Sequence, residues 1–287
     1  MEWGAQAVSV VHRMPMRDYR DHPARSRSQI WPLVTDTPAE CRWRLDHHVD
    51  SDPDHYRLGD ATHAAIFEPT RFSQTWIEKP RMTTKARRAR WEIDHKGLSW
   101  LTSEEWWQVH QMRDALLGNE TFRSLLAPSL GWRELSVFWE HAGGQWKGRL
   151  DSFHPRKRFQ VDVKTTRHSS FRLFHRDCVQ HGVIHQQAFY RWGMRENGIQ
   201  VDGVLVAGVV KPCLPTEVRR PQRAKPHLLE IDSESLDIAE IEIRSAAERF
   251  QRHVESGEWP DETEVHVEGL PEWWKNRFRA GEEVSIG

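Results

Sequence analysis

Two short stretches with alternating side chains constrain the fold of this chain more than any other feature. They read Gly-Arg-Leu-Asp at 148–151 and Val-Asp-Val-Lys-Thr-Thr at 161–166. Alternate residues of a strand face opposite sides, so Asp162 and Lys164 should point to the same side. If the stretches pair as a hairpin, Asp151 lies opposite Asp162, which is destabilising unless a cation lies between them. The pair therefore predicts either a divalent-metal site or a charged surface hairpin.

The surrounding pattern predicts one α/β domain. Alternating segments at 134–139, 145–153 and 158–165 indicate three consecutive strands. The apolar run at 203–210 is typical of a strand covered on both faces, and 227–231 is a further candidate strand. Helical spacing and capping residues predict helices at 29–34, 58–69, 102–117, 122–126, 182–197 and 233–256. This order indicates a mixed sheet flanked by helices, with a helical N-terminal elaboration.

The remaining segments suggest the domain boundaries. Residues 1–24 are polar and predict an irregular N-terminal segment, and 25–260 predict a single domain with its catalytic core at about 130–215. Residues 261–287 are expected to be a C-terminal extension. Within the domain, 49–55 predicts a loop and 70–99 a basic, irregular segment.

Composition narrows the class of protein. The chain is 38% hydrophobic and 29% charged, and it has no apolar run long enough to cross a bilayer. Its first residues lack a basic region followed by an apolar core, so we expect a cytoplasmic protein without a membrane partner. Cys41, Cys178 and Cys213 are widely spaced and form no C-x-x-C pair, so neither a disulfide framework nor a zinc ribbon is indicated.

Basic residues are clustered even though the net charge is only −1. The candidate DNA-binding residues lie in the stretch 79–96 and are Lys85, Arg87, Arg88 and Arg90. A second cluster comprises Lys211, Arg219, Arg220, Arg223 and Lys225. Such stretches can follow a phosphate backbone, and they are equally compatible with a solvated face or a loop.

The hairpin can form a metal-binding site if the side chain of His63 lies close to its two carboxylates. His63 lies in a predicted helix of small residues, which would let other backbone approach it closely. Two carboxylates and an imidazole can hold Mg²⁺ or Mn²⁺ with open positions for water and a phosphate oxygen. Such a metal polarises the phosphorus centre, and Lys164 could orient the nucleophile or stabilise developing charge. These residues together predict metal-assisted phosphodiester hydrolysis.

Four blocks of sequence, in this order, resemble those of one nuclease family. They are Tyr-Arg-Asp-His-Pro-Ala-Arg-Ser-Arg-Ser at 19–28, Gly-Asp-Ala-Thr-His-Ala-Ala-Ile-Phe-Glu-Pro at 59–69, the two stretches of the hairpin, and His-Gln-Gln-Ala-Phe-Tyr at 185–190. Gly-Glu-Trp-Pro at 257–260 resembles the terminal motif of the same family. On these motifs the chain is similar to the RecE-like branch of the PD-(D/E)XK nuclease superfamily, the C-terminal nuclease of exodeoxyribonuclease VIII.

The resemblance implies a restriction-endonuclease-like fold and a role for each matching residue. It implies His63, Asp151, Asp162 and the Val163 carbonyl as metal ligands, Lys164 as the catalytic lysine, and Gln186 and Tyr190 as residues that support the site or contact the phosphate backbone. Asp151 and Asp162 count among the catalytic residues as well. Glu134 is either a second-metal carboxylate or a structural residue. The implied cofactor is Mg²⁺, with Mn²⁺ as a substitute. The three cysteines do not fit an iron–sulfur cluster, and Val183 and Gln187 depart from the family pattern.

Three functional hypotheses follow. The resemblance implies a Mg²⁺-dependent 5′-to-3′ exonuclease on linear double-stranded DNA, acting in recombination or repair or in phage-type replication. It also implies a single-strand annealing protein as partner and a homo-oligomer. The alternatives are a structure- or sequence-specific endonuclease on the same core and a non-catalytic DNA-binding module.

Overall fold

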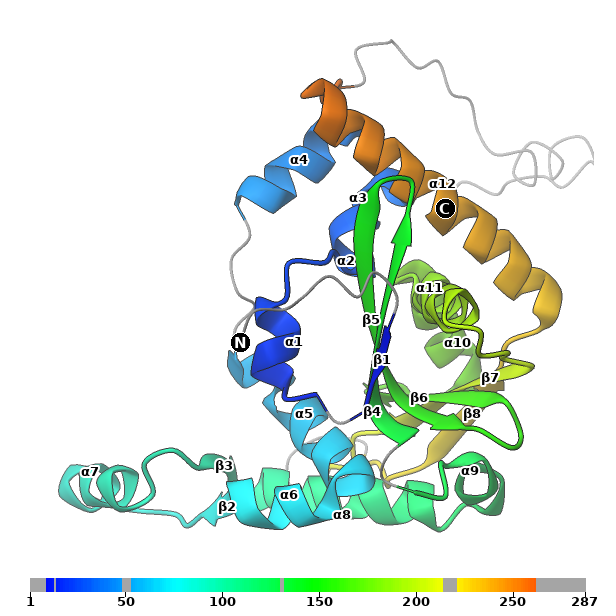
Figure 1. Cartoon of the computed structure of the whole chain (residues 1–287). Coiled ribbons are helices and arrows are strands. Elements are labelled where there is room, and N and C mark those ends of the chain that lie inside the picture. Colours follow the sequence, from blue (N-terminus) through cyan, green and yellow to red (C-terminus); the bar gives the residue numbers. More distant parts are fainter. Residues whose placement is uncertain (1–8, 13, 48–52, 130–131, 214–220, 262–287) are drawn as a thin grey trace, which may run out of the picture.

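The computed structural model describes residues 9–12, 14–47, 53–129, 132–213 and 221–261, and its centre is one six-stranded sheet (Figure 1). The strand order is β1-β4-β5-β6-β7-β8, and β6 and β7 run parallel while the other neighbours are antiparallel. The strands are β1 (Ser9–Val11), β4 (Arg133–His141), β5 (Gly144–His154), β6 (Phe159–Thr166), β7 (Gly203–Val210) and β8 (Pro226–Glu230). The predicted mixed α/β sheet is therefore confirmed.

Helices cover both faces of this sheet. The face that carries Val161 and Val163 packs against α5 (Pro53–Phe67), α8 (Ser103–Leu117) and α9 (Glu120–Leu125). The other face carries Val204 and Val206 and packs against α10 (Phe171–Gln180), α11 (Val183–Glu196) and α12 (Ser233–Ser256). Since strand residues alternate, Asp162 and Lys164 lie on the α10–α12 side of β6.

The N-terminal part is more ordered than the irregular segment that the sequence predicts for 1–24. It contains β1, which extends the main sheet, and α1 (Met16–Asp21). The Nζ atom of Lys147 in β5 donates hydrogen bonds to three carbonyls at the end of α1, those of Tyr19, Arg20 and His22. This buried cation ties α1 to the sheet, a long-range contact that polar local sequence does not reveal.

The single helix predicted at 29–34 is two short helices, α2 (Arg27–Ile30) and α3 (Pro32–Thr35), followed by α4 (Pro38–Asp46). Ser26 begins α2 with a capping box, and Pro32 stands in the first turn of α3. Proline is favoured there because its missing N–H would have no partner within the helix.

The prediction of an irregular segment at 70–99 is wrong. Residues in this region form α6 (Pro69–Thr75), β2 (Trp76–Lys79), α7 (Lys85–Asp94) and β3 (Ser99–Thr102). Strands β2 and β3 pair in parallel, and they carry α7 away from the main sheet (Figure 1). We call residues 76–102 the basic arm. Its strands have only four residues each, which is too short for a clear alternating pattern.

Two further predictions differ from the structure. Helix α10 was not evident from the sequence, and α5 begins at Pro53, so the loop predicted at 49–55 is wrong for its last three residues. Residues 49–52 lie outside the described part, as do 262–287 of the predicted C-terminal extension and Arg219 and Arg220 of the second basic cluster.

Strong local patterns gave correct elements. Thr102 begins α8 through a capping box with Glu105, as its spacing predicts. Every residue of β7 is buried, as expected of a strand covered on both faces. No helix in the described residues combines the length and apolarity that crossing a bilayer requires.

Candidate active site

The candidate site lies where β5 and β6 stop pairing. Their antiparallel ladder joins Ser152 to Val161 and goes no further toward Val163. Beyond it, the amide of Val163 donates a hydrogen bond to Asp151 Oδ2 at 2.7 Å, and its carbonyl oxygen lies 2.8 Å from His63 Nε2. Buried backbone groups need partners, so two side chains replace the missing strand contacts. The divergence of the strands therefore brings Asp151 and His63 to one backbone position.

His63 reaches this position from α5, 100 residues away in the sequence. Ala61 and Ala65 of the same helix are buried, and a side chain added at Gly59 would meet Thr165 of β6. The small residues thus let α5 lie close to the sheet. The second ring nitrogen of His63, Nδ1, is 3.4 Å from Asp151 Oδ2.

Asp162 and Lys164 form a close ion pair on the same side of β6, as the alternation predicts. Lys164 Nζ lies 3.0 Å from Asp162 Oδ1 and 2.9 Å from Oδ2, and only the first contact has hydrogen-bond geometry. The Asp162 residue is 2% exposed. A buried carboxylate oxygen without a hydrogen-bond donor is available to a further ligand.

Burial and mutual charge shift the ionisation of these groups. Burial raises the pKa of Asp151 to about 7, against the opposing effect of His63. Burial alone would lower the pKa of His63, but the carboxylates of Asp151 and Glu134 outweigh it and the pKa is raised. In the same way, burial would lower the pKa of Lys164, but Asp162 and Asp151 raise it. Asp151 and His63 therefore share a strong tendency to hold protons when no cation is present.

Glu134 completes a group of potential metal-binding side chains. Ligand atoms of Glu134, His63 and Asp151 all lie within 4.8 Å of one another. Glu134 has a positive φ of 53° at the start of β4, and its Oε2 accepts a hydrogen bond from Arg149 Nε at 2.8 Å. Arg149 also donates to the Met14 carbonyl, which links the site to the N-terminal segment. The sequence places Arg149 beside Asp151 but does not reveal this role, because its partners are distant in the chain.

Gln186 and Tyr190 of α11 lie beside the carboxylates. The Gln186 amide donates a hydrogen bond to the Tyr190 hydroxyl at 2.9 Å. Burial raises the pKa of Tyr190, and the charge of Asp162 raises it further. The Tyr190 ring packs on Gly148, where an added Cβ would lie 2.8 Å from Cδ1. The absence of a side chain at Gly148, in the first hairpin stretch, therefore leaves room for the Tyr190 ring.

The residues present fit a divalent cation. The observation that supports this is the buried Asp162 Oδ2, which has no hydrogen-bond donor, next to an Asp151 carboxyl whose ionised form is disfavoured. Carboxylate oxygens, a backbone carbonyl and an imidazole are the donors that Mg²⁺ and Mn²⁺ accept. The ligand atoms of His63, Asp151 and Glu134 converge, and the Asp162 carboxylate and the Val163 carbonyl are further oxygens that could hold the ion.

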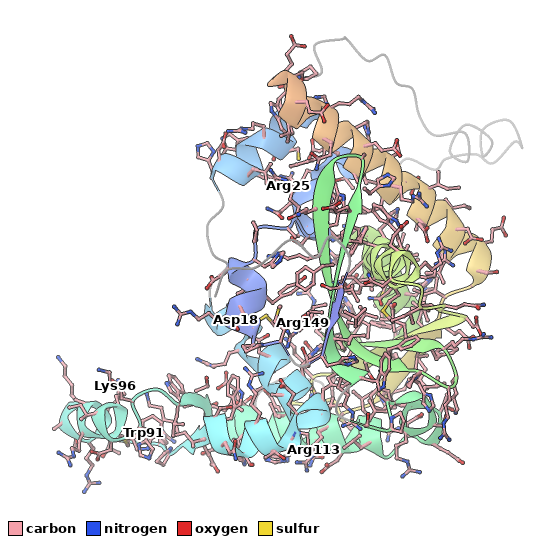
Figure 2. All side chains as sticks on the ribbon, in the orientation of Figure 1. Asp18, Arg25, Trp91, Lys96, Arg113 and Arg149 are labelled. Carbon is pink, nitrogen blue, oxygen red and sulfur yellow. The ribbon has the colours of Figure 1, made fainter. Side chains whose placement is uncertain are left out.

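The predicted DNA-binding residues are not part of this cluster. Lys85, Arg87, Arg88 and Arg90 are exposed on α7 of the basic arm, which Figure 2 marks with Trp91 and Lys96, well away from Arg149. Their order along the helix is unusual. The cations occupy the first two turns, where the helix dipole is already positive, and Glu92 and Asp94 follow in the last turn. This order destabilises a helix and attracts anions to its N-terminal end.

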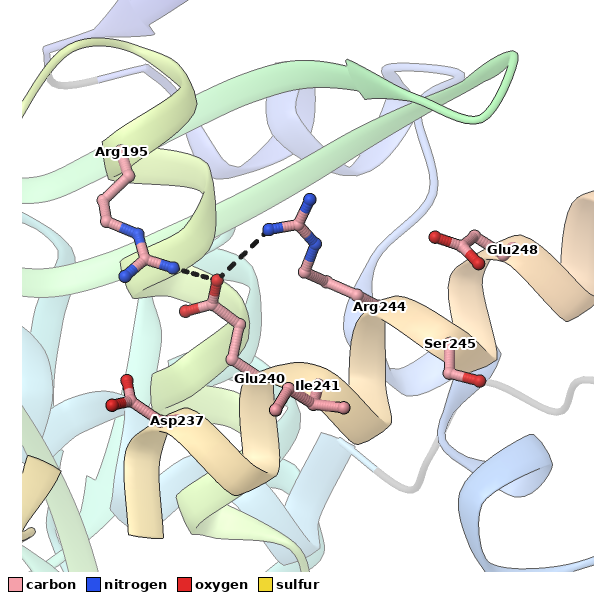
Figure 3. A pocket seen from close by; sticks show the side chains of 7 residues that line it. All are labelled: Arg195, Asp237, Glu240, Ile241, Arg244, Ser245 and Glu248. Atoms are coloured by element: carbon pink, nitrogen blue, oxygen red, sulfur yellow. Dashed lines mark hydrogen bonds and ion pairs between the residues drawn. The ribbon is translucent and has the colours of Figure 1, made fainter. Parts of the chain in front are cut away.

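A surface hollow of about 520 Å³ between α11 and α12 is not part of the candidate site. It is organised around Glu240, whose carboxylate is paired with Arg195 and Arg244 (Figure 3). The same carboxylate is also paired with Arg191 of α11. Glu240 is 4% exposed, so these pairs satisfy a buried charge and hold the two helices together.

Comparisons with known proteins identify the family and the fold. A family model described as "PDDEXK-like domain of unknown function (DUF3799)" matches residues 26–267. A solved structure named "Putative exonuclease", from Eubacterium rectale, superposes with a TM-score of 0.57 at 14% identity, over 92% of this chain and 98% of that one. A phage-related exonuclease from Haemophilus somnus gives a TM-score of 0.33 at 17% identity, over 60% of this chain and 82% of that one. No curated protein matched the sequence.

Proposed function

The chain belongs to the family of PDDEXK-like domains and is a member of the PD-(D/E)XK nuclease superfamily, and from this premise we propose that it is a divalent-metal-dependent deoxyribonuclease. The observation that carries the proposal is the meeting of His63, Asp151 and the Asp162–Lys164 pair around the backbone of Val163. The intact lysine and both carboxylates argue against a module that only binds DNA.

The side chains have distinct tasks in this proposal. A bound Mg²⁺ or Mn²⁺ would supply Lewis-acid polarisation of the scissile phosphate and a water of lowered pKa. Asp151, Asp162, His63 and the Val163 carbonyl would hold the cation in place. Lys164 is protonated at neutral pH because of Asp162, so its ammonium group orients the attacking water by hydrogen bonding and balances negative charge at phosphorus. Gln186 and Tyr190 contact the phosphate backbone beside it.

The finer assignment comes from the motif resemblance. It favours a Mg²⁺-dependent exonuclease of the RecE-like branch that acts 5′ to 3′ on linear duplex DNA in recombination. The basic arm, with Lys85, Arg87, Arg88 and Arg90, would bind the duplex away from the cut. A single-strand annealing protein and a homo-oligomer stay predictions from the same resemblance, as do the single domain at 25–260 and the cytoplasmic location.

One time course tests the proposal. End-labelled linear duplex and closed circular DNA are incubated with Mg²⁺, with Mn²⁺ and with EDTA. We expect the linear duplex to be degraded only when metal is present and the circular DNA to stay intact. Labelling the 5′ end and the 3′ end in separate reactions gives the polarity of degradation. Nicking of the circle would instead establish an endonuclease. Binding of both DNAs without cleavage in any metal would contradict enzymatic function.

A further inference from the structure

Helix α10 lies directly beside the candidate catalytic lysine. Its buried ring, Phe174, packs on Gly208 of β7, where an added Cβ would be 2.5 Å from the ring. Gly208 is the register partner of Lys164 in the parallel β6–β7 pair, and such partners face the same side of the sheet. One turn later, the buried Cys178 belongs to the same apolar core as Phe174, so α10 is anchored on this face of the sheet.

The outer face of α10 combines aromatic rings with cations. Phe171 is 45% exposed, and its ring is parallel to that of His175, with an angle of 6° and centroids 6.3 Å apart. Arg172 and Arg176 are exposed on the same helix. The one carboxylate of α10, Asp177, is 2.9 Å from His168 and 4.0 Å from Arg176, while Arg172 has no carboxylate partner among the described residues. We call Phe171, Arg172, His175 and Arg176 the α10 platform.

Two more cations stand at the adjoining edge of the sheet. Arg167 follows β6 and Lys211 follows β7, and the Lys211 amide donates a hydrogen bond to the Thr166 carbonyl at 2.7 Å. Burial lowers the pKa of Lys211, and the neighbouring charge of Arg167 lowers it further. Cations that crowd together in this way favour a polyanion.

We propose that the α10 platform binds unpaired nucleotides of the DNA strand next to the scissile phosphate, with Phe171 stacking on a base and Arg172 and Arg176 contacting phosphates. An unpaired strand is the ligand that this surface fits, because bases in a duplex are already stacked on both faces. Aromatic platforms with flanking cations bind single strands of any sequence. The proposal rests on the proposed function, since it concerns how substrate reaches that same site.

Binding in EDTA tests the platform without cleavage. The probes are a fluorescein-labelled single strand, a blunt duplex, and a single strand with terminal 2-aminopurine, whose fluorescence falls on stacking. For Phe171→Ala we expect at least about 5-fold weaker binding of the single strand and loss of the quenching. The blunt duplex should bind with less than about 2-fold change. In the double variant Arg172→Gln with Arg176→Gln, the slope of log K against log salt concentration for single-strand binding should decrease in magnitude by about 1.4.

Matched controls are present in the chain. Trp43 of α4 is 56% exposed and stacks on His47, so Trp43→Ala removes an equivalent exposed ring elsewhere. Arg123→Gln removes an exposed cation on α9, on the opposite face of the sheet. Both controls should leave single-strand binding unchanged. Phe171→Leu keeps apolar volume without an aromatic ring, and it should reproduce the loss if stacking is the cause.

The outcomes separate this proposal from the function on which it rests. Wild-type quenching and affinity in a folded Phe171→Ala variant, as judged by circular dichroism, would overturn the α10 platform even if the protein cleaves DNA. Loss of quenching in both Phe171 variants and not in Trp43→Ala would support the platform. A protein that shows this quenching and cleaves no DNA in any metal would refute the nuclease activity alone.

Discussion

The Oδ2 atom of Asp151 accepts a 2.7 Å hydrogen bond from the amide of Val163, so one carboxylate completes the edge of β6 and faces the candidate metal position. The carbonyl of the same residue, Val163, is held by His63. The site therefore uses side chains to satisfy the backbone at the point where β5 leaves β6. Asp151 thus has a structural role, as the acceptor for the Val163 amide, and a proposed metal-binding role. Different substitutions at Asp151 are therefore expected to affect stability and activity differently.

Replacing Asp151 by asparagine or by alanine should separate these two roles. The amide oxygen of Asp151→Asn can still accept the Val163 hydrogen bond, so we expect near wild-type stability with loss of metal binding. Asp151→Ala leaves a buried N–H without a partner, which should cost about 1–3 kcal/mol of unfolding free energy. Urea unfolding followed by tryptophan fluorescence gives the first quantity, and calorimetric titration with Mn²⁺ gives the second. Equal stability of the two variants would contradict the structural role.

Lys164→Ala should reduce metal-dependent cleavage by about 10²- to 10³-fold, because it removes a positioned cation next to the reacting phosphate. DNA affinity should change far less, since a single ammonium contributes little to a long phosphate contact. The matched control is Lys157→Ala in the turn of the same hairpin, where the lysine donates to the Ser124 carbonyl. Unchanged cleavage by Lys164→Ala would exclude it from the catalytic machinery.

The metal-free protein should lose stability as the pH rises from about 4 to about 7. Because burial raises the pKa of Asp151 to about 7 from 3.8, the folded state keeps a proton that the unfolded state releases. The raised pKa of His63 acts in the same direction, since its stabilisation is complete below 6.5 and is lost as the pH rises through the folded pKa. A tenfold difference in proton affinity between the folded and unfolded states corresponds to about 1.4 kcal/mol, so the loss should exceed about 1 kcal/mol.

Unfolding free energies of wild type and Asp151→Asn, measured over this pH range in EDTA, check the sign. The variant lacks the titrating carboxyl, so its curve should be flatter, and the difference between the two proteins isolates the site from other groups. Mg²⁺ should restore the wild-type stability at pH 7 and above, because it replaces the protons. A wild-type curve that rises more steeply than that of the variant would be the opposite result.

The basic arm should contribute to DNA affinity and not to stability. The double variant Arg87→Gln with Arg88→Gln removes two cations from the arm. The slope of log K against log salt concentration for duplex binding should then decrease in magnitude by about 0.9 for each phosphate that the arm no longer neutralises. Thermal stability should stay the same or rise, because cations near the N-terminus of α7 oppose its dipole. The matched control is Arg123→Gln with Lys157→Gln, two exposed cations outside the arm. An equal effect of both pairs would mean that only net charge matters.

Gly148→Ala should impair the site through Tyr190. The added Cβ would lie 2.8 Å from the tyrosine ring and 3.3 Å from Val137, and neither neighbour can move freely in the packed core. We expect a loss of about 1–3 kcal/mol in unfolding free energy and a reduced cleavage rate. Combining the change with Tyr190→Ala should recover stability without recovering activity. Recovery of neither would point to strain elsewhere in β5.

The local pattern determined much of the molecule. Alternation placed Asp162 and Lys164 on one side of β6, and the predicted hairpin register is confirmed by the pairs Ser152–Val161, Phe153–Gln160 and His154–Phe159. Capping residues fixed the start of α8, and uniform apolarity identified β7. Periodicity is a property of neighbouring residues, so it can be read without the rest of the chain. The basic arm escaped this reading because its strands are short and its helix is strongly polar. Helix α10 was missed although Phe174 and Cys178 repeat at helical spacing.

The tertiary structure decided which distant groups meet. Nothing local shows that His63 contacts the backbone of Val163, that Glu134 turns toward His63, or that Arg149 holds Glu134 in place. These contacts depend on how closely α5 packs, on where β5 leaves β6, and on a positive φ at the start of β4. The sequence thus supplied the reactive residue types and their spacing along each strand. Packing and backbone hydrogen bonding decided that they converge, because those forces act between segments that are far apart in the chain.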